Sequence, residues 1–204
     1  MKKALIMVDL QNDFLPGGTL AVPEGDAVIP VANSIINNFN DVIATQDWHP
    51  SNHGSFASQY SGKEPGQQIE LNGLTQILWP DHCVEKSKGA EFAPGLNTEK
   101  ITRVFRKGMD KTVDSYSGFF DNGQLRDTGL GEYLRSLEIT DVFIMGLATD
   151  YCVKFTALDA LNLGFNTHLL KEGIRGVDIN KGDSDNAIAD MKAAGIKIVE
   201  TFSP

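Results

Sequence analysis

The chain has 204 residues, a formal net charge of −9 at pH 7 and 41% apolar residues, which is ordinary for a globular protein with a sizeable core. The negative charge argues against nucleic acid or an anionic membrane as a partner. Its two cysteines form no Cys-x-x-Cys pair, which excludes a disulfide scaffold and a Cys-rich zinc site. The apolar run Ala4–Val8 is too short for a signal peptide and no run could span a membrane, so we expect a reduced cytoplasmic enzyme.

The first elements follow a β-α-β pattern. Lys3–Leu10 is an apolar run that predicts a strand buried on both faces. Residues 28–39 carry apolar side chains at helical spacing, with Pro30 in the first turn, where proline is tolerated. Asp41–Thr45 predicts the second strand. Strands joined through a helix in this way pair in parallel by a right-handed crossover.

Residues 48–100 break this rhythm, because they are rich in Gly, Pro, Ser, Asn and His and show little periodicity. A connection this long is far beyond the usual length of about 4–6 residues, so it is either disordered or functional. The segment Trp79–Val84 inside it is not typical of disorder, and three of the four histidines (His49, His53 and His82) lie in this region. We therefore expect an ordered lid or a metal-bearing loop.

The second half of the chain returns to alternating strands and helices. Further strands are predicted at Ile101–Arg106, Asp141–Met145, Asn166–Leu170 and Ile196–Val199, and helices at Leu130–Leu137, from Tyr151 to Gly164, and at 184–194. The alternation predicts one α/β domain over residues 1–204, with three αβα layers and a mostly parallel six-stranded sheet, as in Rossmann-like folds.

Polar or reactive residues follow four consecutive predicted strands. Asp9 ends the first strand, Asp47 and His49 follow the second, Lys107 follows the third, and Cys152 follows the fourth. In open parallel sheets, ligands bind beyond the carboxyl ends of the strands, and these ends share one edge. A single such residue would indicate only a solvated turn, but four in succession predict a functional site.

The histidine-bearing loop predicts a metal site. Asp47 and His49 are two positions apart on an extended chain, so both can face one ion, and His82 can supply a third ligand. Two histidines and one carboxylate with open positions suit Zn, Fe or Mn in a catalytic site. The alternative is that His82 is a solvent-exposed loop residue. His53 is a fourth candidate, behind the ligands or facing the substrate, whereas Cys83 is interpreted as a packed small residue.

Cys152 is the candidate nucleophile. Asp150 is a candidate helix N-cap, which would place the thiol in the first helical turn, where the helix dipole tends to lower a thiol pKa. The alternative is a buried structural cysteine. Asp9 can accept the thiol proton and later deliver one to a leaving group, and Lys107 can stabilise the thiolate. The N–H groups of Ala148 and Cys152 are candidates for an oxyanion hole, so the set predicts amide hydrolysis through a thioester.

Six short motifs, in order along nearly the whole chain, then point to a family. They are Val8-Asp-Leu-Gln-Asn-Asp-Phe14 with Pro16-Gly-Gly18, Gln46-Asp-Trp-His-Pro50 with Asn52-His-Gly-Ser-Phe56, Leu78-Trp-Pro-Asp-His-Cys-Val84, Phe105-Arg-Lys-Gly108, Asp114-Ser-Tyr-Ser-Gly-Phe119 and Gly146-Leu-Ala-Thr-Asp-Tyr-Cys-Val153. Together these motifs resemble those of the isochorismatase-type cysteine hydrolases, and within them the bacterial nicotinamidases, which are also called pyrazinamidases.

The resemblance implies an isochorismatase-like fold and hydrolysis of nicotinamide to nicotinate and ammonia in NAD salvage, and of pyrazinamide to pyrazinoate. It implies that the catalytic residues are Asp9, Lys107 and Cys152. It also implies that one divalent metal ion, most often zinc and otherwise iron or manganese, binds to Asp47, His49 and His82. The aromatic residues that bind the substrate ring would then be Phe14, Trp79 and Tyr116. In this family the ion binds the pyridine nitrogen, and a cis peptide precedes the oxyanion-hole alanine, here Leu147–Ala148. The partner is then a small molecule, with a homo-oligomer left open.

Four alternatives remain at this stage. Related amidases that act on carbamoyl or ureido substrates generally lack the metal set, and a true isochorismatase needs no cysteine nucleophile. A non-catalytic binding module on the same fold would not need the complete Asp9, Lys107 and Cys152 set. A dinucleotide-binding oxidoreductase is disfavoured because the first βα turn lacks Gly-x-Gly-x-x-Gly.

Overall fold

A computed structural model describes residues 2–203 and contains a six-stranded sheet in the order β5-β2-β1-β6-β7-β8. Every neighbouring pair of strands in this sheet runs parallel. The strands are β1 Lys3–Val8, β2 Asp41–Asp47, β5 Arg103–Lys107, β6 Asp141–Leu147, β7 Asn166–Arg175 and β8 Lys197–Val199. The predicted α/β fold with six parallel strands is confirmed, and the strand ends differ from the predicted ones by a few residues at most, except at β7, which continues to Arg175.

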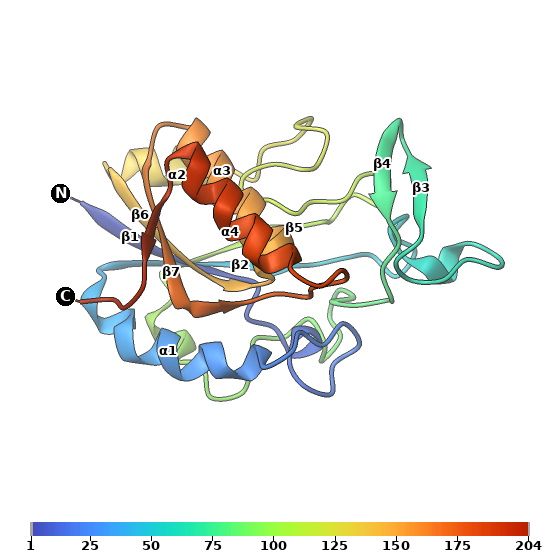
Figure 1. The fold of residues 1–204 in the computed structure, drawn as a ribbon, viewed down its shortest axis with the longest axis horizontal. Helices are drawn as coiled ribbons and strands as arrows, with labels where there is room; N and C mark the ends of the chain where they lie inside the picture. The colour runs from blue at the N-terminus through green and yellow to red at the C-terminus, as the bar shows by residue number, and fades with distance from the viewer. Residues whose placement is uncertain (1, 204) are drawn as a thin grey trace.

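Helices cover both faces of the sheet, so the molecule has three layers (Figure 1). Helix α1 packs on one face, and α2, α3 and α4 pack on the other. The α-helices are α1 Val28–Ile35, α2 Leu130–Ser136, α3 Lys154–Asn162 and α4 Asp183–Ala194, with 3-10 turns at Asn12–Phe14, Gly25–Ala27, Ile36–Asn38, Ala57–Gln59 and Thr98–Lys100 and a π-helix at Thr149–Val153.

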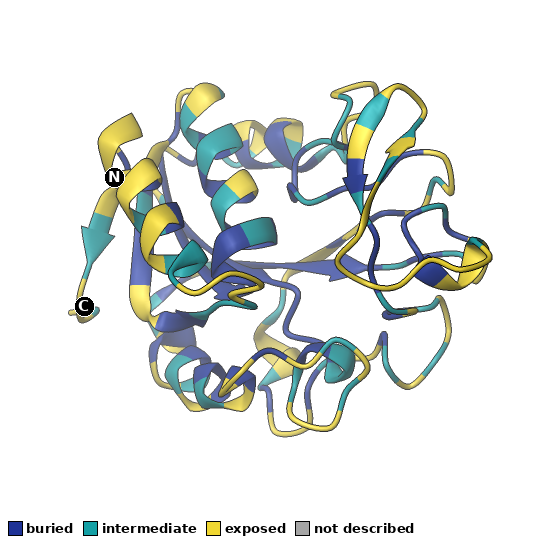
Figure 2. Ribbon diagram, turned by 45° about the vertical axis from the view of Figure 1, so that its right-hand side comes forward, coloured by how far each residue is buried: buried dark blue, intermediate teal, exposed yellow. Residues whose placement is uncertain are grey.

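The central strands are apolar on both sides because both faces of the sheet are covered. In β1, Leu5 and Met7 belong to the core beneath α1, whereas Ala4 and Ile6 belong to the core beneath the other helices. All four of these side chains are fully buried. Figure 2 shows the same pattern, with buried strands at the centre and exposed residues on the outer sides of the helices. This rigid centre fixes where the strand ends, and hence the site, can lie.

The region 48–100 is ordered and contains a two-stranded antiparallel hairpin that the sequence analysis did not predict. Strands β3 (Gln68–Leu71) and β4 (Leu74–Ile77) are joined by Asn72 and Gly73, whose φ angles are 51° and 80°. Asn-Gly between two strand-like segments is the strongest short-range hairpin signal, so the information was present in the sequence. In Figure 1 the hairpin stands beyond the carboxyl ends of β2 and β5, apart from the main sheet.

No helix among residues 2–203 is both long and apolar enough to cross a membrane.

Candidate active site

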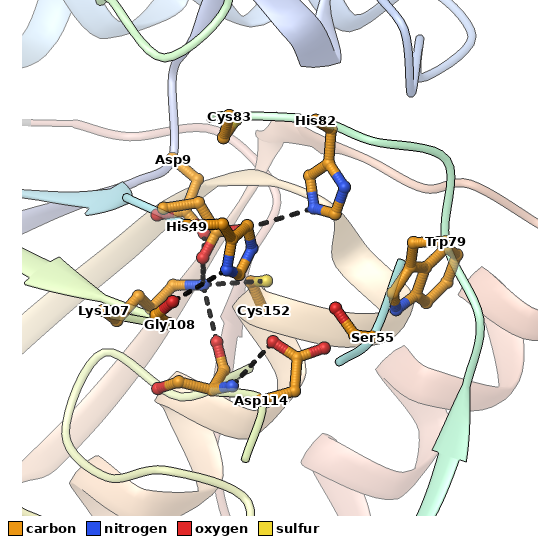
Figure 3. A network of polar contacts seen from close by, with 12 residues as sticks. Asp9, His49, Ser55, Trp79, His82, Cys83, Lys107, Gly108, Asp114 and Cys152 are labelled. Carbon is orange, nitrogen blue, oxygen red and sulfur yellow. Dashed lines mark hydrogen bonds and ion pairs between the residues drawn. The ribbon is translucent and has the colours of Figure 1, made fainter. Parts of the chain in front are cut away.

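Lys107 occupies the centre of the site, at the end of β5 (Figure 3). Its side chain is fully buried, and its Nζ lies 2.6 Å from Asp47 Oδ1, 2.9 Å from Asp9 Oδ2 and 2.9 Å from the Ser115 carbonyl oxygen. The Cys152 sulfur lies 3.3 Å from the same nitrogen. Three strands that are separate in the sequence therefore bring two carboxylates and one thiol around a single ammonium group.

Asp9 follows β1 in a left-handed backbone conformation, with φ of 50°. Its Oδ1 accepts a hydrogen bond of 2.6 Å from the Thr45 hydroxyl, which holds the carboxylate in place. Its Oδ2 is ion-paired with Lys107, but the contact lacks hydrogen-bond geometry and this oxygen has no hydrogen-bond partner. Asp9, Asp47 and Cys152 offer atoms within 4.8 Å of one another, which places the Asp9 carboxylate near the thiol as its candidate proton acceptor.

The charges in this cluster are strongly coupled. Burial raises the pKa of Asp9, with Lys107 opposing the effect. Burial would also raise the pKa of Asp47, but Lys107 and His49 outweigh it and hold the pKa of Asp47 well below its ordinary value. Burial would lower the pKa of Lys107, but the two carboxylates outweigh it and raise that pKa well above its usual range. Lys107 is therefore a permanent cation, and Asp9 is the more basic carboxylate.

The thiol of Cys152 differs from what the sequence suggested. Burial raises its pKa well above the ordinary value, and Lys107 only partly opposes this effect. The predicted lowering of the pKa is thus wrong, because burial outweighs the effect of Lys107 and the carboxylates of Asp9 and Asp47 add to the effect of burial. A thiolate formed by proton loss to solvent would add a second net negative charge to a buried site. Transfer of the proton to Asp9 keeps the total charge constant and is the less costly route.

The turn that carries Cys152 is a π-helix with Ala148 at its N-cap, so the prediction of Asp150 as N-cap is wrong. The Asp150 carboxylate instead accepts hydrogen bonds from the backbone N–H groups of Val177 and Asp178, at 3.0 and 2.8 Å. Cys152 does lie in the first helical turn, as expected. The side chain of Asp150 therefore holds the 177–178 loop against this turn. A sequence pattern alone cannot distinguish this role of an aspartate from that of a helix N-cap.

The backbone before Cys152 has the cis peptide bond between Leu147 and Ala148 that the resemblance implied. The N–H groups of Tyr151 and Val153 both donate to the Ala148 carbonyl. Among residues 2–203, neither the Ala148 nor the Cys152 N–H group donates to a backbone carbonyl outside the π-helix. Both groups belong to the turn that carries the thiol, which is the location that an oxyanion hole requires.

Asp47, His49 and His82 come together as the sequence suggested, with ligand atoms within 4.8 Å of one another and every residue buried. His49 Nε2 is 3.5 Å and His82 Nε2 is 3.7 Å from Asp47 Oδ2. The Nδ1 atoms of His49 and His82 instead contact the carbonyl oxygens of Gly108 (2.9 Å) and Pro80 (2.8 Å). These contacts turn both Nε2 atoms toward Asp47. Metal-ligating histidines are commonly oriented in this way, with the other ring nitrogen bonded to a backbone carbonyl oxygen.

Several observations show that this set fits a divalent cation. The Nε2 atom of His49 is buried and has no hydrogen-bond partner, so its lone pair is free for a metal ion. Gly108 has φ of 66°, and a Cβ atom there would come within 2.3 Å of the His49 ring, so glycine is required for the ring to sit in this position. Two imidazoles and one carboxylate are suitable for zinc and do not exclude iron or manganese.

His53 lies behind the ligands and does not line the pocket. Its ring is 4.4 Å from that of His49, and its Nδ1 is 2.7 Å from the Ser55 hydroxyl oxygen. Burial lowers the pKa of His53 to about 4, so the ring is neutral at physiological pH. The structure thus brings His53 to the metal-binding side of the site but not to the pocket wall.

Sequence analysis assigned no role to two polar residues that hold the ligands in place. The Gln11 side chain donates to the Asp47 carbonyl oxygen at 2.8 Å and accepts from the Asp47 N–H at 2.8 Å. The Asp13 carboxylate accepts from the Cys83 N–H at 2.7 Å, next to His82. Cys83 itself is buried in the core, as expected. Both polar residues belong to the Val8–Phe14 motif, which was the signal available for them.

A pocket opens above the thiol and between the aromatic side chains. Its lining residues are Phe14, Leu20, Asp47, Trp79, His82, Asp114, Tyr116, Ala148, Tyr151, Cys152 and Val177. The predicted ring-binding residues Phe14, Trp79 and Tyr116 are among them. Tyr151, which stacks edge-on against Trp79 with ring centroids 4.8 Å apart, and the buried carboxylate of Asp114 were not predicted. The pocket is therefore apolar, aromatic and small, with the thiol and the candidate metal ligands at its floor.

Comparisons with known proteins agree with this geometry. The model of the isochorismatase domain matches residues 3–202. The chain belongs to the isochorismatase domain family. Within it, the chain is 54% identical to a nicotinamidase of Escherichia coli (strain K12) over 95% of its own length and 92% of that protein.

Solved structures of this isochorismatase family are similar over the whole fold. An Acinetobacter baumanii nicotinamidase/pyrazinamidase structure superposes with a TM-score of 0.94 at 42% identity, covering 97% of this chain and 95% of that one. The pyrazinamidase of Pyrococcus horikoshii, solved in complex with zinc, superposes with a TM-score of 0.80 at 39% identity, covering 99% of this chain and 100% of that one. A zinc-bound relative and the Asp47, His49 and His82 cluster together support a divalent metal in this isochorismatase-family protein.

Proposed function

We propose that this protein hydrolyses nicotinamide to nicotinate and ammonia, and pyrazinamide to pyrazinoate, through a thioester intermediate on Cys152. The nicotinamide reaction would serve NAD salvage. The observation that supports the proposed hydrolysis most directly is the convergence of Asp9, Lys107 and Cys152 beneath an aromatic pocket that Asp47 and His82 also line, with His49 beside these two. The identity to nicotinamidases points to the same substrate class. Residues 1–204 act in this proposal as one domain, with the 48–100 region as part of the site.

In the proposed reaction, the sulfur of Cys152 attacks the carboxamide carbon while its proton passes to Asp9. The N–H groups of Ala148 and Cys152 stabilise the oxyanion of the tetrahedral intermediate. Asp9 then delivers that proton to the departing nitrogen, the C–N bond breaks, and ammonia leaves. Water hydrolyses the thioester, with Asp9 taking a proton from the water and returning one to the sulfur.

Lys107 has an electrostatic role in this scheme. It keeps the site close to neutral while a proton moves between the thiol and Asp9, and it lies within hydrogen-bonding distance of the developing thiolate. It does not itself need to lose a proton, in agreement with its raised pKa.

Asp47, His49 and His82 would hold the metal ion, for which we propose zinc. When bound, the ion supplies a Lewis-acid contact for the pyridine nitrogen of the substrate. Phe14, Trp79 and Tyr116 would enclose the ring and exclude water, and the nearby floor of the pocket would place the carboxamide at the thiol.

The test is ammonia release from nicotinamide by the purified, zinc-loaded protein. We expect release that is suppressed by iodoacetamide and also by chelation of the metal. Because iodoacetamide could in principle reach both cysteines, the measurement is repeated with Cys83→Ala, in which only Cys152 remains. Absence of release from the reduced, metal-loaded protein would refute nicotinamide as the substrate, and carbamoyl and ureido compounds would then be tested.

A further inference from the structure

Gln76 extends from strand β4 of the hairpin to the back of the pocket wall. Its side chain is buried, although the hairpin is mostly exposed. The amide nitrogen lies 3.0 Å from Asp114 Oδ2 and 3.2 Å from the Tyr116 hydroxyl oxygen, and it also lies 2.7 Å from the Ile77 carbonyl oxygen. Asp114 and Tyr116 both line the pocket, so one buried amide contacts two wall residues from behind.

The Tyr116 hydroxyl oxygen receives a second donor. Trp79 Nε1 lies 3.2 Å from it, and the two rings meet edge-on with an interplanar angle of 85°. Burial raises the pKa of Tyr116 well above its ordinary value, so the phenol remains neutral. Since two donors from different segments meet at one oxygen, the tilt of both aromatic walls depends on the position of the Gln76 amide.

Asp114 depends on the same amide. Its carboxylate is buried and accepts from the Ser115 N–H at 2.8 Å through Oδ1 and from Gln76 through Oδ2. Within residues 2–203, Gln76 is the only side chain that donates a hydrogen bond to it. Without this donor, Oδ2 would be a buried charged atom lacking a partner, which is costly, and the carboxylate would turn toward the pocket or toward solvent.

The hairpin is fixed firmly enough to hold the amide in place. Its strands continue into backbone hydrogen bonds from Leu78 N–H to Gln67 O (2.8 Å) and from Trp79 N–H to Ser55 O (2.8 Å). Leu71 packs so closely on Gly54 that a Cβ atom there would come within 2.8 Å of it. Figure 3 shows Ser55, Trp79 and Asp114 on the same side of the site. The hairpin is therefore held in place behind the pocket wall, which Gln76 contacts through Asp114 and Tyr116.

We propose that Gln76 is a positioning residue for recognition of the substrate ring, acting through Tyr116, Trp79 and Asp114. The inference deepens the proposed function and rests on it. Gln76 does not touch the reacting atoms, so it contributes binding that is equal in the ground state and the transition state. Loss of such binding raises KM and leaves kcat unchanged, whereas a purely structural role would reduce the amount of active enzyme and lower kcat at unchanged KM.

The experiment compares Gln76→Met with Gln68→Met. Methionine keeps the length and the apolar volume of glutamine but cannot donate a hydrogen bond. Gln68 is an exposed glutamine on the partner strand β3 and controls for the same chemical change in the hairpin. We expect KM for nicotinamide to rise about tenfold in Gln76→Met, the effect of losing about one hydrogen bond, with kcat within about twofold of wild type. Gln68→Met should match the wild type in both values.

A double-mutant cycle with Tyr116→Phe tests whether the effect passes through the shared hydroxyl. We expect Gln76→Met to raise KM less in the Tyr116→Phe background than in the wild type, because the common acceptor is already absent. An unchanged KM in Gln76→Met, or a fall in kcat alone, would refute the role of Gln76. The proposed hydrolysis of nicotinamide would still stand in that case, provided that the wild type releases ammonia. If Gln76→Met does not fold, an unchanged KM in Tyr116→Phe would refute it. No hydrolysis by the wild type would overturn both proposals.

Discussion

The two sides of the site, which we call the thiol side and the histidine side, come from different kinds of chain segment. The thiol side, with Asp9, Lys107 and Cys152, lies at the ends of three parallel strands, of which β1 and β6 are buried on both faces and β5 is the edge strand. The histidine side takes Asp47 from a strand, but His49 and His82 come from the long connection between β2 and β5. The packed sheet holds the strand ends in place, whereas a loop must be held by individual contacts along its length.

This difference appears in how each side is held. Lys107 on the thiol side is ion-paired with Asp9 and also with Asp47 of the histidine side, so these buried charges hold one another in place. On the histidine side, the Gln11 amide donates to the Asp47 carbonyl oxygen, and the carbonyl oxygens of Gly108 and Pro80 contact the Nδ1 atoms of His49 and His82. We therefore expect loss of the Lys107 charge to lower stability as well as activity, and changes on the histidine side to affect metal and substrate binding with little loss of fold.

The largest expected effect is that of Cys152→Ala. Removal of the nucleophile should lower turnover of nicotinamide by about 10⁴-fold or more, because no other group in the pocket can form the thioester. The melting temperature and zinc uptake should stay close to wild type. Cys83→Ala is the matched control, since that cysteine is buried but lies outside the pocket, and it should retain activity. Full activity in Cys152→Ala would disprove the thioester mechanism.

Lys107→Met should be the most destabilising change. It leaves Asp9 and Asp47 buried without their cation, at a cost of about 3–5 kcal/mol in the free energy of unfolding at neutral pH. Without the ammonium group, burial would raise the folded-state pKa of Asp9 further above that of the unfolded chain. The folded state then binds more protons, so in the metal-free variant stability should fall as pH rises above about 4.

Denaturant unfolding of the metal-free variant at pH 4 and pH 7 measures this effect. Lys171→Met is the control, because Lys171 is 46% exposed in its ion pair with Glu200 and should change stability by about 1 kcal/mol or less. An equal decrease in the free energy of unfolding in Lys107→Met and Lys171→Met would show that the buried Lys107 ion pairs contribute no more to stability than an exposed pair.

On the histidine side, His82→Ala should weaken zinc binding by about a hundredfold or more, since one of three protein ligands is lost. The unfolding transition should remain cooperative, because His82 lies in a loop outside the sheet. Calorimetric titration with zinc measures the affinity. His168→Ala serves as the control, because this histidine stacks on Phe143 within the sheet and should leave zinc binding intact. Unchanged zinc affinity in His82→Ala would remove this residue from the ligand set.

The smallest expected effect is that of Gln11→Leu. The Gln11 side chain donates to the carbonyl oxygens of Asp47 and Ala90 and accepts from the Asp47 N–H, so its loss should shift the Asp47 carboxylate without removing it. We expect zinc affinity to fall about tenfold, the lower end for groups that orient a metal ligand, as measured by the same titration. A decrease in zinc affinity as large as that in His82→Ala would mean that Gln11 holds the 48–100 loop in place and does not only orient Asp47.

The hydrophobic pattern was sufficient for the order of strands and helices, because buried parallel strands are apolar throughout and the helices between them carry one apolar stripe. Errors occurred where the local signal was ambiguous. Residues 36–39 continue the helical spacing of α1, yet the structure has a 3-10 turn there. Asp150 has the type and position of an N-cap, yet its carboxylate binds a loop 27 residues away.

The sequence by itself determined which side chains collect in the site. The carboxyl ends of parallel strands lie at one edge, so Asp9, Asp47, Lys107 and Cys152 had to come together once the strands were recognised. Only the tertiary structure decided how protons are distributed among them, because a pKa depends on burial and on the nearest opposite charge. The same holds for Gln76, whose contacts with Asp114 and Tyr116 join residues 38 and 40 positions apart. No periodic pattern in the sequence indicates such contacts, because they form only when separate segments pack against one another.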